Sequence, residues 1–254
     1  MSTVGSYRGP NIVTRGLVLH LDAASPNSYY SPNGGTVWKD VSGNDISPSM
    51  YNQAAHIDSA PKSFTLDGTN DYIQVPTTTP SLEFQYSDNF TIEAYAYVKE
   101  SGTGYIINNR KADSPITYAG WGMAIASGQV ACFVGGYQSG YKWRRVDSST
   151  SDFSTYVANK WAHIVWVNSS MEGQGKVYIN GVDRTNTSAD DSTPPATVPY
   201  VTEHKVSIGI SPADGTPGGH YLNGEIGAIR IYNRALSAQE VLQNFNATKD
   251  RFGL

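Results

Sequence analysis

The residues of this sequence best able to do chemistry are its carboxylates, and their spacing argues against hydrolysis. A retaining glycoside hydrolase needs two carboxylates about 5 Å apart, which acidic residues two or four positions apart on one strand would supply. Glu93 has no acidic neighbour at either spacing. No Glu-x-Asp-x-x-Glu motif occurs among the seven glutamates, which are Glu83, Glu93, Glu100, Glu172, Glu203, Glu225 and Glu240.

Other catalytic and cofactor motifs are missing from the sequence too. The five histidines are scattered, and there is no Gly-x-Ser-x-Gly elbow to suggest Ser/His/Asp catalysis. The sequence contains neither closely spaced zinc ligands nor a glycine-rich phosphate loop. We therefore predict no catalytic residues and a protein that is not an enzyme.

Calcium is the one metal that the sequence favours. Two short turns each carry a pair of carboxylates, Asp40 with Asp45 and Asp67 with Asp71. Carboxylate and carbonyl oxygens are the ligands that Ca²⁺ prefers. Asp and Asn in such turns also form simple Asx-turns without any metal, and this alternative stays open. The four aspartates are thus candidate ligands for a structural calcium ion.

An aromatic and basic cluster is the best candidate for a contact surface. It comprises Tyr137, Tyr141, Trp143, Arg144 and Arg145. Tyr, Trp and Arg are enriched at binding hot spots because they combine large contact area with directional hydrogen-bond donors. An ordinary hairpin with amphipathic side chains is the alternative. Among functional interpretations we favour protein contact over sugar stacking, although the nearby carboxylates of Asp147 and Asp152 keep sugar binding open.

The composition of the chain limits which classes of protein and of binding partner it fits. The 254 residues include 18 Lys and Arg and 22 Asp and Glu, so a formal net charge of −4 offers no basic field for nucleic acid. The single cysteine, Cys132, lies in an apolar run and is expected to be a buried small hydrophobe. No apolar run approaches the roughly 18 residues of a membrane span, and we expect no signal peptide.

Short strands separated by turn residues dominate the chain and predict an antiparallel sandwich or barrel. Residues 90–98 alternate, with Tyr95 and Tyr97 on a face that we expect to be exposed and that is a second candidate contact surface. The nearly continuous apolar run at 161–168 predicts a central strand. Asn180-Gly181 predicts a type I′ hairpin turn, and the capping box from Ser237 to Glu240 predicts the one convincing helix.

Several segments, taken together, resemble the laminin-G-like branch of the concanavalin-A-like lectin/glucanase superfamily. They are Gly16–Ala23 with Trp38–Asn44, Phe64–Ile73, Phe90–Val98, Trp161–Val167, Val177–Gly181 and Asn223–Ser237. The resemblance implies an all-β, two-sheet antiparallel jelly-roll sandwich with one short C-terminal helix. It also implies loops that often carry a structural calcium. Most relatives have Asp where Gly227 stands here, which removes one potential calcium ligand.

The first and last segments of this resemblance are similar to versions found in virion proteins of tailed phages of marine and cyanobacterial hosts. This similarity implies a non-enzymatic virion structural protein, first of all a capsid decoration (cement) protein that acts through protein–protein contacts and surface display. The alternative is a carbohydrate-binding adhesin or lectin module, on a tail fibre or baseplate, that contacts host surface glycans.

The resemblance also sets the expected organisation and partners. We expect an N-terminal arm at 1–15, the jelly-roll domain at 16–245 and a C-terminal tail at 246–254, with both ends held by a partner. The expected partners are other virion proteins, namely the major capsid protein or tail components, and cell-surface glycans in the alternative, with neither nucleic acid nor membrane. We expect a homo-oligomer located at the surface of the phage particle after assembly in the host cytoplasm.

Overall fold

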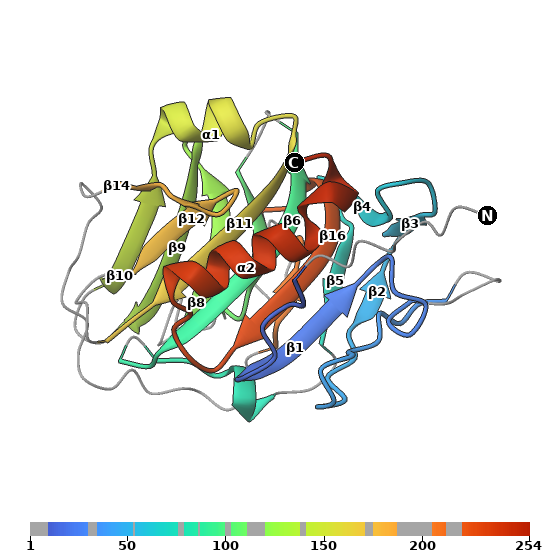
Figure 1. Cartoon of the computed structure of the whole chain (residues 1–254), viewed down its shortest axis with the longest axis horizontal. Helices are drawn as coiled ribbons and strands as arrows, with labels where there is room; N and C mark the ends of the chain where they lie inside the picture. Colours follow the sequence, from blue (N-terminus) through green and yellow to red (C-terminus); the bar gives the residue numbers. More distant parts are fainter. Residues whose placement is uncertain are drawn as a thin grey trace, which may run out of the picture.

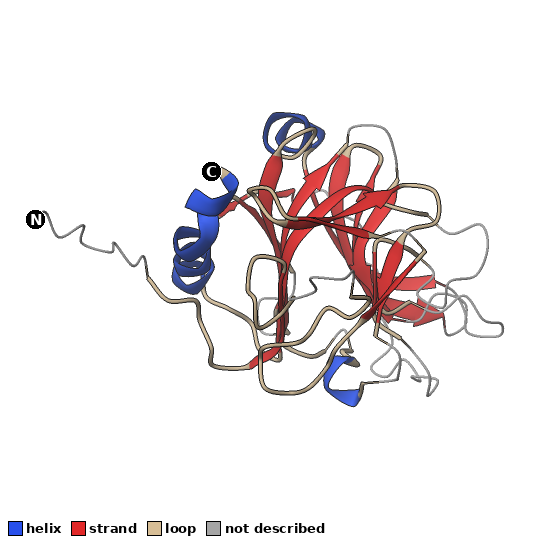
Figure 2. Ribbon diagram, turned by 90° about the vertical axis from the view of Figure 1, so that its right-hand side faces the viewer, coloured by secondary structure: helices blue, strands red, loops and turns tan. Residues whose placement is uncertain are grey.

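Two antiparallel sheets face each other in the computed structural model, and a C-terminal helix lies on the outer side of one of them (Figures 1 and 2). The all-β sandwich predicted from the sequence is therefore confirmed. The structure describes residues 10–29, 35–52, 54–75, 79–85, 87–99, 103–110, 120–137, 141–170, 175–186, 205–211 and 220–254. None of the helices in these ranges is long and apolar enough to cross a membrane.

The first sheet, sheet A, is built around two long strands, β6 and β16. Its order is β13-β12-β11-β6-β16-β4-β3, and β1 pairs with the part of β16 that extends beyond β4. The strands are β1 (Leu17–Asp22), β3 (Ala55–Ile57), β4 (Ser63–Asp67), β6 (Phe90–Val98), β11 (Trp161–Asn168), β12 (Lys176–Ile179), β13 (Val182–Asp183) and β16 (Asn223–Tyr232).

The second sheet, sheet B, runs in the order β14-β10-β9-β8-β7-β15-β5-β2. Its strands are β2 (Ser49–Tyr51), β5 (Tyr72–Gln74), β7 (Gly104–Asn108), β8 (Gly120–Ala126), β9 (Gln129–Tyr137), β10 (Tyr141–Ser148), β14 (Thr185–Asn186) and β15 (Ser207–Ile208). The helical elements are η1 (Pro80–Leu82), α1 (Thr150–Tyr156), α2 (Ala238–Thr248) and η2 (Lys249–Phe252).

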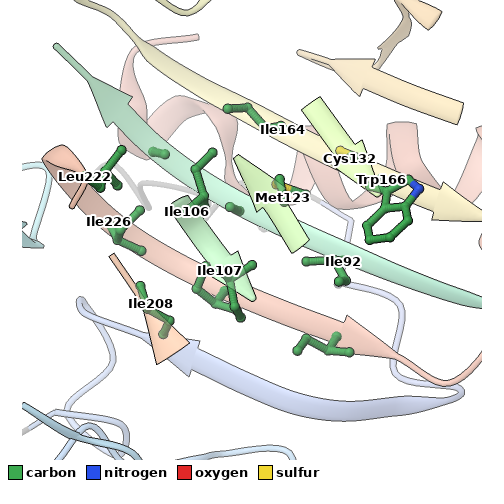
Figure 3. Close-up of a cluster of buried hydrophobic side chains, with 14 of the residues drawn as sticks. Ile92, Ile106, Ile107, Met123, Cys132, Ile164, Trp166, Ile208, Leu222 and Ile226 are labelled. Atoms are coloured by element: carbon green, nitrogen blue, oxygen red, sulfur yellow. The ribbon is translucent and has the colours of Figure 1, made fainter. Parts of the chain in front are cut away.

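The main hydrophobic core fills the space between the two sheets (Figure 3). Trp38, Trp121 and Trp166 are almost fully buried there. Cys132 is also buried in this core, as predicted, and burial raises the pKa of its thiol well above the ordinary value. It therefore contributes to packing as a small apolar side chain.

Strand β6 has the predicted bounds, but its second face is not exposed. Glu93 and Tyr95 on that face are as inaccessible to solvent as the core residues on the other. The reason is that α2 and η2 cover this side of sheet A, which the strand's own alternation cannot reveal. Tyr95 is therefore not available as a contact residue, and Tyr97 is half-buried.

Local signals in the sequence predicted other elements well. The central strand at 161–168 is confirmed as β11, and Asn180 and Gly181 have φ of 53° and 77°, as a type I′ turn requires. The capping box is present at Ser237 and Glu240 at the start of α2. Helix α1 was not predicted, because its seven residues bury only one side chain, Phe153, and so leave no periodic apolar stripe.

The end of the chain packs on its own sheet. Phe252 stacks on Tyr95 with ring centroids 4.6 Å apart and lies 4.7 Å from the ring of Trp161. A Cβ atom at position 227 would overlap the Phe252 ring, so Gly227 makes this packing possible. The chain itself thus holds its C-terminal residues, whereas the sequence had predicted a partner. Residues 1–9 of the predicted arm lie outside the described residues.

Candidate functional site

The outer face of sheet B gathers aromatic and charged side chains on three strands, β7, β9 and β10. Along β9, Val130, Cys132 and Val134 enter the core, so the alternation of a strand directs Phe133 to the opposite face. Phe133 pairs with Arg145 on β10, and Ala131 pairs with Asp147. The register between these two strands therefore brings an aromatic ring, a guanidinium and a carboxylate to one face.

Tyr105 and Arg110 complete this cluster. The rings of Tyr105 and Phe133 meet edge to face, with centroids 5.9 Å apart and an interplanar angle of 79°. The Arg110 guanidinium lies 4.9 Å from the Phe133 ring centre and 5.6 Å from that of Tyr105, and its Nη1 donates to the Tyr105 hydroxyl. We call Tyr105, Arg110, Phe133, Arg145 and Asp147 the aromatic–arginine platform.

A glycine beneath the platform sets the position of its central ring. A Cβ atom at position 122 would lie 2.7 Å from Cζ of Phe133, so any larger residue here would displace this ring from its place against β8. Arg145 is fixed by Asp147, because its Nε donates to both carboxylate oxygens at 2.9 and 3.0 Å and its Nη2 lies 2.9 Å from Oδ2. The hydrogen bond to Asp147 raises the pKa of Arg145 against the effect of burial. The platform is thus preorganised.

The structure separates the residues that the sequence grouped into one contact surface. Arg145 is on the platform, whereas Arg144 pairs with Val134 and alternates to the side of the sheet that Val146 shares. Tyr141 pairs with Tyr137 and Trp143 with Gly135, and the side chains of these two tyrosines and this tryptophan lie outside the described part of the structure. Their role stays a prediction.

Sequence reasoning missed Tyr105, Arg110 and Phe133. The signal for Phe133 was present, because apolar residues at 130, 132 and 134 leave 133 on the other face. Tyr105 and Arg110 could not be assigned in this way, since they join the platform only through pairing of β7 with β8 and of β8 with β9.

The predicted calcium turns are held by hydrogen bonds of their own. Asp40 is buried, and its two oxygens accept from the backbone of His20, Ser42 and Ile46 at 2.9, 2.8 and 3.2 Å and from the Ser42 hydroxyl at 2.8 Å. These bonds use the four lone-pair sites of a carboxylate. Asp45, in the same turn, is exposed with φ of 56°.

The second turn is similar. Asp67 Oδ1 accepts from the backbone of Thr69, Asn70 and Asp71 at 2.8, 3.1 and 3.3 Å. Burial is the largest single influence on the pKa of Asp67 and raises it, but the backbone bonds together bring this pKa below its ordinary value. Among the described residues no group of three or more His, Cys, Asp or Glu side chains is placed to hold a metal ion. The Asx-turn alternative explains what these residues do here, and calcium binding stays a prediction.

The outer face of sheet A contains a different cluster, centred on Glu93. The Arg230 guanidinium pairs with Glu93, Asn244 Nδ2 donates to Glu93 Oε2 at 2.7 Å, and His163 Nε2 lies 3.1 Å from Oε1. Burial alone would raise the pKa of Glu93, but the charge of Arg230 and the bonds from His163 and Asn244 lower it to about 2. Glu93 therefore serves as an internal ion-pair partner beneath α2.

The fold and these two faces define a concanavalin-A-type β-sandwich with one covered outer face and one that bears an aromatic–arginine platform. A family model described as "Concanavalin A-like lectin/glucanases superfamily" matches residues 67–242, which is more than half of the chain. The chain belongs to this superfamily, as the resemblance had indicated. No curated protein sequence matches the chain.

Solved structures share the fold at low sequence identity. The binding domain of Paraclostridial Mosquitocidal Protein 1 is 19% identical with a TM-score of 0.63, and the match covers 91% of this chain and 52% of that one. The binding domain of botulinum neurotoxin DC, solved with rat synaptotagmin II, is 15% identical with a TM-score of 0.64, covering 92% and 52%. Trypanosoma rangeli sialidase, solved with the inhibitor DANA, is 20% identical with a TM-score of 0.60, covering 95% and 35%. The chain thus spans about half or a third of the length of these proteins.

Proposed function

We propose that this chain is a non-enzymatic binding module that acts through the outer face of sheet B. The observation that carries the proposal is the preorganised aromatic–arginine platform. Edge-to-face rings, a guanidinium stacked over both of them and an arginine fixed by a carboxylate are the features of a binding hot spot. Arg145 does not have to be immobilised on binding, which removes one of the entropic costs of association.

The comparisons support binding as the function without identifying the partner. Two of the solved structures are described as binding domains, and one of those was solved with a protein bound to it. Two of the buried carboxylates are already engaged in structural contacts: Glu93 is buried in an ion pair, and Asp40 accepts four hydrogen bonds. The match to the sialidase covers 35% of that chain, so its activity belongs to a protein about three times as long as the matched part.

We further propose that the module decorates a tailed-phage capsid, where the platform contacts a neighbouring virion subunit. The support for this setting is the similarity of the first and last family segments to phage virion proteins. A rigid sandwich with one face closed by its own helix suits such a role, because the closed face adds stability while the other face makes the contact. We propose the major capsid protein as partner and a homo-oligomeric arrangement on the particle.

The test is the protein content of purified particles. Quantitative mass spectrometry should find the chain at a copy number that fits the symmetry of the capsid lattice. If the chain is absent from washed particles, or is present at the few copies of a tail component, the decoration role is wrong.

Glycan binding is the second candidate function. The observation that favours it is that the platform combines aromatic rings with the Asp147 carboxylate, which is paired with Arg145, since sugar sites combine an aromatic face with polar side chains. A glycan array probed at high protein density distinguishes the two candidates. Hits that disappear in Phe133→Ala would favour a host-glycan adhesin, and an empty array would leave protein contact as the function of the platform.

A further inference from the structure

A pocket of ≈ 890 Å³ lies away from the platform, at the open edge of the sandwich. It is lined by residues of β3, the last strand of sheet A, and of β2, the last strand of sheet B, together with residues 23–36 in part. Its volume is in the range of small-molecule sites, which is about 300–1,000 Å³. Among the described residues, β3 is the last strand of sheet A at this edge and β2 the last strand of sheet B.

Three polar side chains of this pocket present hydrogen-bond acceptors. The Tyr29 hydroxyl donates to the Gly35 carbonyl at 3.1 Å, so its remaining capacity is as an acceptor. His56 Nε2 lies 3.0 Å from the Ala23 carbonyl oxygen and must donate to it, which leaves Nδ1 of the neutral ring as an acceptor. Asn52 donates one of its two amide N–H groups to the Asn70 carbonyl, and its Oδ1 is an acceptor.

Apolar side chains supply much of the remaining lining. Ala23, Ala24, Pro26, Met50 and Ala54 all contribute to the pocket. The rings of Tyr29 and His56 pack on each other, with centroids 4.5 Å apart, and both pack on Phe64. Because this aromatic packing fixes the two rings, their acceptor atoms stay where they are in the absence of a ligand.

We infer that this pocket binds a primary alkylammonium group. An –NH₃⁺ group has three donors and no acceptor, which matches the Tyr29 hydroxyl, His56 Nδ1 and Asn52 Oδ1. The aliphatic stem of such a ligand fits the alanine, proline and methionine surface. The Tyr29 hydroxyl and His56 Nε2–H are both donated to backbone carbonyls, so these two groups offer a ligand acceptors rather than donors.

An ammonium group of the chain itself lies at the edge of the pocket. Lys62 Nζ is 2.5 Å from Asp58 Oδ1, and both residues line the pocket. Their side chains are 42% and 82% exposed, so a ligand ammonium can replace Lys62 beside the Asp58 carboxylate. The chemistry is shared by lysine side chains of partner proteins and by free polyamines.

The test uses the full chain with ¹³C-methyl methionine and n-butylammonium as the probe. Met50 lines the pocket, whereas Met123 is fully buried in the core and serves as an internal control. Titration should shift the Met50 signal saturably and leave that of Met123 in place. Tetramethylammonium, which has the charge without N–H donors, and n-butanol should shift Met50 far less. No Met50 shift with butylammonium, or an equal shift with tetramethylammonium, would overturn the inference.

Two variants test the acceptors and the competing lysine. Tyr29→Phe should bind butylammonium about tenfold more weakly, because it loses a hydrogen bond to a charged group. Tyr51→Phe is the matched control on β2 and should bind like the wild type, since Tyr51 is outside the pocket lining. Lys62→Gln should bind more tightly. Equal affinity of the two tyrosine variants would contradict the assignment.

The two sources of the ammonium group are distinguished with two further ligands. Nα-acetyl-lysine amide stands for a lysine on a partner protein, and spermidine stands for a free polyamine. Tighter binding of the lysine derivative would identify a protein partner, and tighter binding of spermidine would identify a soluble amine. Because the pocket is separate from the platform, loss of binding here leaves the proposed function of sheet B unaffected.

Discussion

The outer faces of the two sheets carry charged and aromatic residues in similar arrangements but use them differently. On sheet A, Glu93 and Arg230 form an ion pair beneath α2, and both are almost fully buried. On sheet B, Arg145 and Asp147 form an ion pair whose arginine is 39% exposed, beside the half-buried ring of Phe133. The Glu93–Arg230 pair holds α2 against sheet A, and the Arg145–Asp147 pair fixes an arginine on the proposed contact surface of sheet B.

This comparison shows why the strand pattern alone was misleading. Strand alternation puts Tyr95 and Phe133 alike on outer faces, although only Tyr95 was predicted there, yet the ring of Tyr95 is covered by Phe252 and that of Phe133 adjoins Arg110. The two rings differ in burial because α2 and η2, which are distant from β6 in the sequence, pack on the outer face of sheet A. Mutations on the two faces should therefore affect different properties. Those on the outer face of sheet A should reduce stability, and those on the outer face of sheet B should reduce binding.

The largest effect is expected for Glu93→Gln. It removes the carboxylate that is paired with the buried Arg230 guanidinium, which costs about 3–5 kcal/mol in the free energy of unfolding. Urea unfolding followed by tryptophan fluorescence measures the loss. Glu225→Gln on the same sheet is the control, because this carboxylate accepts from the Ser63 hydroxyl and is less buried. Similar costs for both variants would refute a special role for Glu93.

Removing the C-terminal ring comes next in size. Phe252→Ala should cost about 3 kcal/mol, because the ring is buried against Tyr95 and Trp161. Gly227→Asp should cost about 1–3 kcal/mol by overpacking against this ring. In the Phe252→Ala background the cost of Gly227→Asp should largely vanish. Strict additivity in thermal unfolding would show that the glycine and the ring are not coupled.

Acid should weaken sheet A in a defined range of pH. The pKa of Glu93 is lowered from 4.5 to about 2 in the folded chain. Its stabilising contribution is therefore complete above pH 4.5 and is lost as the pH falls toward 2. Urea unfolding measured from pH 6 to pH 2 should show this decline, and Glu93→Gln should reduce its slope. An unchanged slope in the variant would rule Glu93 out as its source.

The smallest effect on stability is expected on the platform. Arg145→Ala should cost under about 1 kcal/mol, since the ion pair with Asp147 is partly exposed. Its effect on particle binding should be much larger, because it removes a fixed arginine from the contact surface. Co-sedimentation with particles that lack the chain measures this binding. If Arg145→Ala loses stability and retains binding, the roles assigned to the two faces are reversed.

The sequence predicted the elements better than the site. The strand at 90–98, the Asn180-Gly181 turn and the capping box at Ser237 are local signals, and all three are confirmed. The residues of the predicted contact cluster lie on β9 and β10, which also carry Phe133 and Arg145 of the platform, and their role as a contact surface stays a prediction. Phe133, Tyr105 and Arg110 were missed because the platform depends on register between strands. The burial of Tyr95 depends on helix docking, which no local pattern encodes.

The central claim is that the chain acts through the outer face of sheet B. The most direct measurement is the copy number per purified particle for Phe133→Ala and for Leu242→Ala, by quantitative mass spectrometry. Leu242 is the matched apolar control, since it is 46% exposed on α2 over sheet A. We expect Phe133→Ala to reduce the copy number severalfold and Leu242→Ala to leave it unchanged. Full occupancy by a folded Phe133→Ala, or loss of the chain in Leu242→Ala alone, would contradict the claim.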